Sequence, residues 1–356
     1  MVDMTSGRIA PQILKFAMPV LLGLVFQRIY NFADSYIVGH FLGDNALAAV
    51  SVAGVGMYLV FSLIIGLTTG VTVVMSQYYG AKEEDKVVKT FFSSIFIAVG
   101  MTILVTVIGL LTTRPLLIVL QTPAEVLDVA VLYLRIICAG SVGTMLYNWI
   151  FAVLRSLGNS VVPLIFLGIS SLLNIVFDIL FVAVIPLGVG GAAFATVLAQ
   201  VISGVACLLY AWKILPMLRI RRDKLKLDTY IGKQMLVYGL PAALQMSIIS
   251  ISDMTLQAVV NTYGTTLVVA YGVCVKVEWL GMQVGDALGT ALGTFTGQNT
   301  GAKNIGRIKA GFRTTFLLNA IGYAVVSPLI FLLAPVVMRM FTDNQEAIAY
   351  GVEYMH

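Results

Sequence analysis

The sequence predicts an all-α, polytopic membrane protein, and two observations support this class. Of its 356 residues, 59% are hydrophobic and only 11% are charged, which is too little charge to keep a globular domain of this size in solution. Apolar stretches of about 20 residues recur along the whole length, as membrane-spanning helices require. The alternating segments of about ten residues that build a transmembrane barrel do not occur in this sequence. The lipid bilayer is therefore the first predicted partner.

Nine apolar spans are expected in order along the chain. Several exceed the minimum length, so we expect them to tilt or to extend past the bilayer. The chain then ends a few residues into a tenth such segment. The nine expected spans cover residues 13–40, 47–76, 91–111, 129–153, 161–185, 190–212, 233–262, 266–296 and 312–338.

The basic residues set the expected orientation in the membrane. Lys and Arg together number 22, and they cluster before the first span and in every second connection. The remaining connections carry only Arg114 and Arg339. Because cytoplasmic connections are enriched in Lys and Arg, we expect a multi-pass protein of the cell membrane with its N-terminus in the cytoplasm. Clusters that lie between spans also argue against nucleic acid as a partner.

An internal duplication divides the chain into two halves. The segment SQYYGAKEEDK (76–86) recurs as GQNTGAKNIGR (297–307), so that the Gly-Ala-Lys run at 80–82 matches the one at 301–303. Pro19 and Pro241, near the start of each half, match at nearly the same offset. A duplication of this length places six spans in each of two parallel lobes. We expect three further spans beyond His356, with a first lobe at 1–213, a cytoplasmic connector at 214–232 and an incomplete second lobe at 233–356.

Five acidic side chains lie at membrane depth, where a charge costs roughly 2.5–3.5 kcal/mol on insertion scales and therefore indicates a function. They are Asp34, Asp178, Asp253, Glu278 and Asp286. A helical rise of about 1.5 Å per residue puts Asp34, Asp178 and Thr196 at one level, roughly 10 Å below the outer helix ends. Asn174 and Tyr30 each lie one turn further inward.

This oxygen-rich set predicts a binding site for a proton or a sodium ion, with Asp34 and Asp178 as the ligands of the metal ion. Two carboxylates in a poorly solvated pocket raise each other's proton affinity, so that one of them can load and release a proton near neutral pH. A polar knot that joins three helices is the alternative explanation of the same residues.

Two other charged residues are expected to pair. Asp253 lies ten residues before the outer end of the seventh span and Lys276 lies ten residues into the eighth, so both fall at one depth. We expect an ion pair between them that joins two helices, with contact to substrate as the alternative. The sequence identifies no partner for Arg28, Glu278 or Asp286.

No enzyme motif is present. The two histidines are His40 and His356, so a serine–histidine–acid set cannot form inside the bundle. The three cysteines lack metal-ligand spacing and are expected to be buried apolar residues. GVGGAA (188–193) is a loose dinucleotide-binding pattern, but it follows an apolar span and lacks an acid about 20 residues further on, so tight helix packing explains it better. The sequence predicts neither catalysis nor a cofactor.

Several segments together resemble one known family, the multidrug and toxic compound extrusion family. The resemblance rests, in order, on PVLLGLVFQRIYNFADSYIVGHFLGDNALAAVSV (19–52), SQYYGAK (76–82), VLRSLGNSVVP (153–163), SLLNIVFDILFV (171–182) and GVGGAAFATVLAQ (188–200). It covers essentially the whole chain. It implies twelve helices in two lobes, and an antiporter that exports organic cations or other amphipathic drugs in exchange for protons or sodium ions.

The resemblance also implies site residues. The cation site of the amino-terminal lobe, in the branch with the DNA-damage-inducible members, falls on Asp34, Asn174, Asp178 and Thr196, with Asn148 as a further amide. A glutamate that another branch uses in its seventh helix corresponds to Ile249 here, so coupling through the second lobe is not implied. Small-molecule cations are then the expected substrates of a monomer.

The expected mechanism is rocking of the two lobes around a central cavity. Ion binding at Asp34 and Asp178 changes the packing of the first span. Pro19 is the expected hinge, because a proline inside a helix removes one backbone hydrogen bond. The alternative function is a flippase for lipid-linked sugar precursors, which would favour a basic central cavity.

Overall fold

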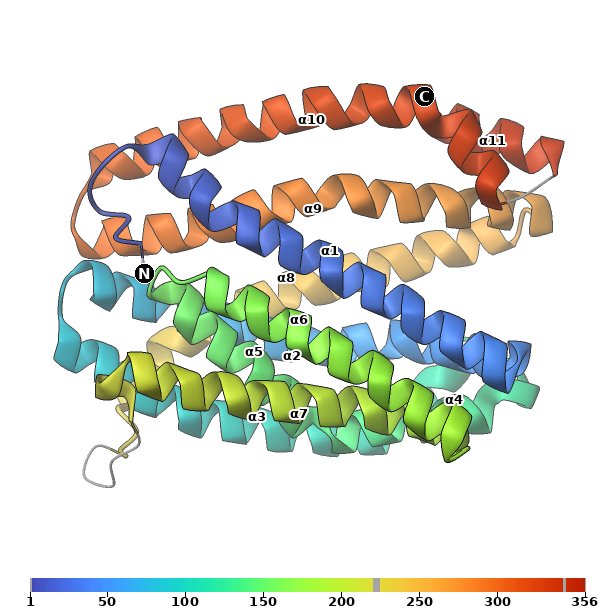
Figure 1. Cartoon of the computed structure of the whole chain (residues 1–356), viewed down its shortest axis with the longest axis horizontal. Helices are drawn as coiled ribbons and strands as arrows, with labels where there is room; N and C mark the ends of the chain where they lie inside the picture. The colour runs from blue at the N-terminus through green and yellow to red at the C-terminus, as the bar shows by residue number, and fades with distance from the viewer. Residues whose placement is uncertain (1, 220–224, 342–343, 356) are drawn as a thin grey trace.

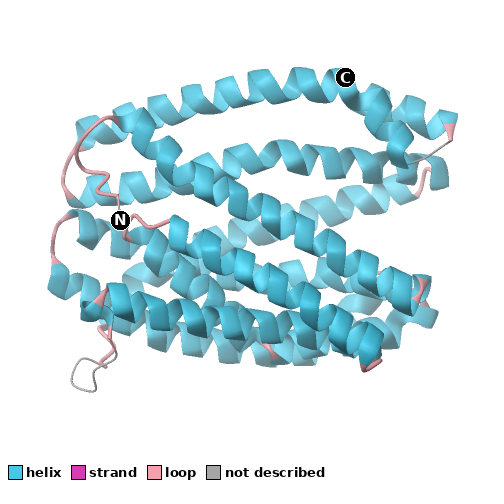
Figure 2. Cartoon of the chain, in the orientation of Figure 1, coloured by secondary structure: helices cyan, strands magenta, loops and turns pink. Residues whose placement is uncertain are grey.

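The computed structural model describes residues 2–219, 225–341 and 344–355, and helices account for nearly all of this part of the chain (Figure 2). The first half contains α1 (Ile9–Leu42), α2 (Asp44–Gly80), α3 (Glu84–Val119), α4 (Ala124–Ala139), α5 (Ser141–Ser156), α6 (Val161–Asp178), the π-helical η1 (Ile179–Val184) and α7 (Gly188–Ile214). The short 3-10 helix η2 (Pro216–Leu218) is followed by α8 (Thr229–Asn261), α9 (Thr265–Gly301), α10 (Ile305–Phe341) and α11 (Gln345–Met355).

These helices confirm the predicted class. Eight helices within the described residues are long and apolar enough to cross a membrane, and α4 with α5 makes a ninth crossing if the pair is taken as one span bent by 50°. The sequence predicted an unbroken span over 129–153, whereas the structure divides it at Gly140. A Cβ on Gly140 would overlap the side chain of Val197. The break therefore falls at a residue whose missing side chain lets α7 approach closely.

The backbone repeats itself at the offset that relates the two Gly-Ala-Lys runs. α2 and α9 both contain 37 residues, and each follows a glycine with positive φ, Gly43 at 83° and Gly264 at 95°. Each also ends in a turn where a lysine has positive φ, with Lys82 and Lys303 both at 57°. These matched turns agree with the duplication found in the sequence. The lobe boundaries stay predictions, and part of the connector at 214–232 lies outside the described residues.

α1 crosses the molecule and packs against helices of both halves (Figure 1). Phe16 and Val20, in its first half, share a buried core with Phe295 of α9. Further along, Gly23 lies against leucine side chains of α6. α1 is helical throughout, including at Pro19, which lies between Phe16 and Val20 within the contact with α9.

α2 packs along the length of α8 and joins the two halves. The largest buried core extends over α2 to α7 and includes Ile231 and Met235 of α8. Glycines make the approach possible, because a Cβ on Gly70 would overlap the carbonyl oxygen of Met235 and one on Gly66 would overlap Ala243. The two halves are thus in backbone contact along this pair of helices.

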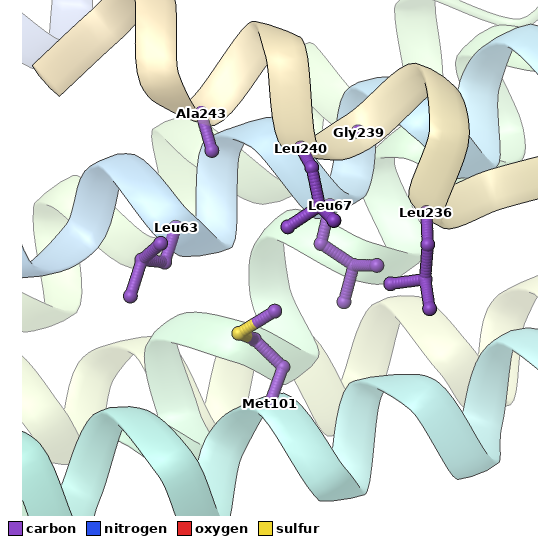
Figure 3. A pocket seen from close by; sticks show the side chains of 7 residues that line it. All are labelled: Leu63, Leu67, Met101, Leu236, Gly239, Leu240 and Ala243. Atoms are coloured by element: carbon purple, nitrogen blue, oxygen red, sulfur yellow. The ribbon is translucent and has the colours of Figure 1, made fainter.

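A small apolar cavity lies beside the α2–α8 contact (Figure 3). Its volume is about 10 Å³. The lining residues are Leu63 and Leu67 of α2, Met101 of α3, and Leu236, Gly239, Leu240 and Ala243 of α8. None of these side chains is polar, so we regard the cavity as a packing void.

Candidate functional site

Two buried carboxylates face each other between α1 and α6. Asp34 lies eight residues before the end of α1, and Asp178 is the last residue of α6. Asp178 is fully buried and Asp34 is 9% exposed. The two side chains are near enough for a hydrogen bond between their carboxyl groups. Because an ionised carboxylate can only accept, that bond forms when one of the two carries a proton.

A π-helical turn follows Asp178 directly. It covers Ile179–Val184, and α7 begins shortly afterwards at Gly188. The carbonyl oxygen of Phe181 lies 2.7 Å from where a Cβ of Gly191 would be, so this turn and α7 are in close contact. π-Helical turns inside helices are often found at functional sites. No sequence pattern predicts this one, because the apolar span over 161–185 has the character of a regular helix.

An amide and a hydroxyl lie beside the carboxylates. Asn174, one turn before Asp178, is 3% exposed, and its Nδ2 donates to Oγ1 of Thr196 at 3.3 Å. Thr196 lies eight residues into α7, at the level of Asp34 in α1. The structure therefore brings together the four residues that helical rise had placed at similar depth.

Two tyrosines complete the group. Tyr30 lies one turn before Asp34 on α1 and interacts electrostatically with both carboxylates. Tyr133 of α4 is 4% exposed, and its phenol interacts electrostatically with the same carboxylates and lies near the hydroxyl of Thr196. The sequence reasoning missed Tyr133. It lies nine residues into α4, but the predicted span began only at residue 129, so the depth argument did not bring it to the level of the carboxylates.

Without a shared proton, four acceptor oxygens of this group have no hydrogen-bond partner among the described residues. They are Oδ1 of Asp34, Oδ1 of Asn174 and both carboxylate oxygens of Asp178, and all are buried. Burying unpaired acceptors destabilises a protein. A proton or a small cation among these atoms removes that cost, and hard cations prefer oxygen ligands of this kind. The donor set therefore fits a proton or a sodium ion.

A small polar cavity lies beside the group. Its volume is about 20 Å³, which is room for one water-sized ligand. Its lining residues are Gln27, Tyr30, Tyr147, Ser170, Ser171, Asn174, Thr196, Ala199 and Gln200. Most of them carry polar side chains, in contrast to the apolar void near Met101. One water molecule, or a small ion without its hydration shell, therefore finds polar surroundings next to the carboxylates.

Three other predicted residues are not among the contacts of this group described above. Nδ2 of Asn148 donates to the carbonyl oxygen of Thr144, 2.7 Å away in the same helix. Asp253 is exposed on α8. The side chain of Lys276 lies outside the described residues, so its ion pair with Asp253 stays a prediction.

Arg28 reaches from α1 to α9. Its guanidinium carbon lies 4.2 Å from the ring centre of Trp279. Asp286, also on α9, and Tyr58 of α2 interact with it electrostatically. The sequence left Arg28 and Asp286 without partners, because the packing of α1 against α9 joins positions that are far apart along the chain.

Comparison with known proteins places these residues in a family. The MatE family model matches residues 19–180 and 241–356, two segments that begin at the repeat prolines. The probable multidrug resistance protein YpnP of Bacillus subtilis (strain 168) is 31% identical over 356 residues, which covers 99% of this chain and 79% of that protein. The probable multidrug resistance protein NorM of Thermotoga maritima is 24% identical over 344 residues, covering 96% and 74%.

Solved structures show the same fold. A MOP superfamily transporter from Pyrococcus furiosus superposes with a TM-score of 0.91 at 23% identity, over 99% of this chain and 79% of that one. An outward-facing MATE family multidrug resistance transporter of the same superfamily gives a TM-score of 0.90 at 23% identity and the same coverage. This multi-pass membrane protein therefore belongs to the MatE family.

Proposed function

We propose that this protein is a secondary active antiporter that exports cationic or amphipathic drugs in exchange for protons or sodium ions. The observation that carries the proposal is the set of four buried, unpartnered oxygens on Asp34, Asn174 and Asp178. Similarity to proteins named for multidrug resistance supports the export of drugs. The basic connections support an N-terminus in the cytoplasm, and we propose that the monomer is the working unit.

The coupling ion acts on α1 in this proposal. Asp34 lies beyond Pro19 on α1, whereas Phe16, which shares a core with α9, lies before it. A proton or cation between Asp34 and Asp178 removes their repulsion and changes how α1 fits against α6. Because Pro19 lacks an N–H, α1 can bend there. A bend moves the two parts of α1 relative to each other and so carries the change to α9.

The drug is proposed to bind between the halves, near Arg28, Trp279 and Asp286. The ring of Trp279 offers a π face and Asp286 a negative charge, and both attract organic cations. A flippase for lipid-linked sugars would need a basic space instead. Here two carboxylates, those of Asp253 and Asp286, lie near enough to Tyr58 to interact with it electrostatically. These acids give the region negative charge, so we favour the export of cations.

The test is gradient-driven export of a fluorescent cationic dye by the protein in lipid vesicles. Asp34→Asn and Asp178→Asn should each abolish it, because an amide neither takes up a proton nor neutralises a cation. Asp44→Asn is the matched control, an exposed acid at the start of α2, and should export normally. Export by Asp34→Asn at the unmutated rate would remove the carboxylate pair from the mechanism.

The two candidate coupling ions are separated by varying sodium at fixed pH. If sodium is the ion, dye export should rise with the sodium gradient while the pH is equal on both sides. If the proton is the ion, export should follow the pH gradient and ignore sodium. Export that depends on neither gradient would contradict antiport.

A further inference from the structure

Residues 2–7, here named the strap, lie across the end of the bundle where α1 begins. One end of the strap is fixed to the first half of the chain. The backbone nitrogen of Val2 donates to the carbonyl oxygen of Gly158 at 2.9 Å, in the connection between α5 and α6. Gly158 has a φ of 80°, and a Cβ there would overlap the carbonyl oxygen of Val2. Only glycine admits the strap at this position.

The middle of the strap is fixed to the second half. The backbone nitrogen of Met4 donates to Oε1 of Gln298 at 3.0 Å, and its carbonyl oxygen accepts from Nδ2 of Asn299 at 3.0 Å. Met4 is fully buried, in the core that α1 shares with α9. Gln298 and Asn299 are fully buried as well, so water does not compete for these hydrogen bonds.

The guanidinium of Arg307 on α10 forms several hydrogen bonds with the strap and the residues next to it. Its guanidinium donates to five acceptors, which are the carbonyl oxygens of Met4 (3.0 Å), Ser6 (3.4 Å) and Gly7 (2.8 Å) and the side-chain oxygens of Gln12 (3.1 Å) and Asn299 (3.1 Å). Nη2 approaches three of these acceptors with two N–H groups, so one of its hydrogen bonds is shared, and a lysine ammonium with three N–H groups could not serve all five acceptors. Arg307 therefore contributes more hydrogen bonds to the strap than any one of its neighbours described above.

Next to the strap, α2 and α9 meet at their repeated turns. A Cβ on Gly80 would overlap the carbonyl oxygen of Gln298, and one on Gly301 would overlap that of Gln77. Gln77 and Gln298 occupy corresponding positions of the two repeats, so the contact is reciprocal. Nε2 of Gln298 also donates to the carbonyl oxygen of Ser156 at 3.1 Å. This end of the bundle is closed across both halves.

We propose that the strap is a latch that holds the two halves together at this end, and that Arg307 fastens it. The proposal rests on the proposed function, because a transporter that opens alternately to each side must separate its halves here. Opening breaks either the bond from Val2 or the bonds of Met4, since these tie one short segment to opposite halves. All of them are hydrogen bonds, so the latch can release and form again.

The strap also keeps its own shape. Oδ1 of Asp3 accepts from the backbone nitrogen of Thr5 at 2.8 Å and from its hydroxyl at 2.5 Å, and Oδ2 accepts from the hydroxyl of Ser6 at 3.4 Å. None of these bonds crosses between the halves. The strap can therefore leave Arg307 as a preformed turn, which lowers the entropy lost when the latch closes again.

Ser76 offers a reporter of opening, because it is fully buried against Gly297 between α2 and α9. Ser76→Cys is placed in the full chain with its three buried cysteines replaced by alanine. Labelling by a membrane-impermeant maleimide is then measured in vesicles that expose the N-terminal side, without drug or ion gradient. Arg307→Met should speed labelling about tenfold, since hydrogen bonds to a charged group are the stronger ones. Deletion of residues 2–7 should do the same.

Lys309→Met is the matched control, since Lys309 is exposed on the same helix and carries the same charge. It should label at the unmutated rate. Arg307→Met in the deleted chain should add less than it does in the full chain, because three of the five acceptors of Arg307 belong to the strap. Three outcomes would overturn the latch. They are an unchanged labelling rate in Arg307→Met, an equal acceleration by Lys309→Met, and a further tenfold acceleration in the combined variant. Labelling needs no transport, whereas the Asp34→Asn test measures transport, so the two proposals fail separately.

Discussion

Asp178 combines two features of the candidate site. It is a fully buried acid without a hydrogen-bond partner, and it is the last α-helical residue before a π-helical turn. Asn174 and Thr196 bond to each other beside it, which holds their oxygens in place. The chemistry of the site therefore depends on side chains that are fixed before any ion arrives.

Tyr133 gives the first prediction at this scale. Tyr133→Phe keeps the ring but removes the hydroxyl that lies near Thr196 and the two carboxylates. We expect the apparent affinity for the coupling ion to fall about tenfold, the size of one lost polar interaction in a buried site. The measurement is the ion concentration that gives half-maximal dye export. Tyr210→Phe, at a residue 42% exposed on α7, is the control. An unchanged ion dependence in Tyr133→Phe would show that the hydroxyl does not support the site.

Asp3 gives a prediction about pH. Hydrogen bonding from the Thr5 side chain, the largest cause, holds the pKa of Asp3 below its ordinary value of 3.8. A depressed pKa means that the stabilisation is present above that ordinary value and is lost only as pH falls through the lower one. Labelling of Ser76→Cys, relative to an exposed cysteine, should therefore not change between about pH 5 and pH 8. Asp3→Asn should speed it at every pH, and a rise confined to mildly acidic pH would contradict this assignment.

The sequence identified the site residues whose depth in the membrane could be calculated. Asp34, Asn174, Asp178 and Thr196 could be grouped because an acid is rare in a membrane span and helical rise gives its depth. Depth does not give direction around the helix axis. Asn148 therefore entered the prediction although its amide bonds to its own helix, and Tyr133 was left out.

At the scale of elements, α1 is the helix that links the site to the rest of the bundle. Phe16 and Val20, on either side of Pro19, share a core with α9, and the last turns of α1 carry Asp34 to α6. Pro19 is an interior proline of this helix, whereas Pro11 lies in its first turn. The two ends of α1 can move separately only if the helix bends between them.

Pro19→Ala tests this bend. Alanine restores the missing backbone hydrogen bond and stiffens α1. We expect dye binding to persist while the maximal export rate falls about tenfold, because stiffening affects the motion and leaves the site intact. Pro115→Ala, at an interior proline of α3, is the control. Equal loss in both variants would mean that Pro19 has no special role.

The sequence located the helices but not their ends, since α3 covers Glu84–Val119 where the predicted apolar span was 91–111. Two local departures from regular helix were not predicted at all. The break between α4 and α5 depends on the contact of Gly140 with Val197, and the π-helical turn after Asp178 depends on the approach of α7. Both are tertiary effects inside spans that are apolar throughout, so periodicity alone contains no signal for them.

Across the whole molecule, the two halves repeat the helices and their turns but not the carboxylate of the candidate site. α2 and α9 match in length and in both terminal turns. At the offset that relates these turns, Asp34 corresponds to Thr255, whose hydroxyl bonds to the carbonyl oxygen of Ile251 in its own helix. The carboxylate of the candidate site is therefore not repeated at the corresponding position of the second half.

Gly80→Ala tests the closed end independently of the strap. The added Cβ would overlap the carbonyl oxygen of Gln298, which is backbone and cannot rotate away. We expect the two turns to separate and Ser76→Cys to label about tenfold faster with the strap intact. Gly54→Ala, at a position on α2 with open space around it, should change nothing. Normal labelling in Gly80→Ala would mean that the turns do not close this end.

The reciprocal turns of α2 and α9 have a consequence for the direction of movement. Each copy of the turn supplies one glycine and one glutamine carbonyl oxygen to the joint, Gly80 against Gln298 and Gly301 against Gln77. The two copies are no longer identical, because Ser76 of one corresponds to Gly297 of the other. Two unlike sides resist separation unequally, so a separation of the halves would begin at one side of this joint.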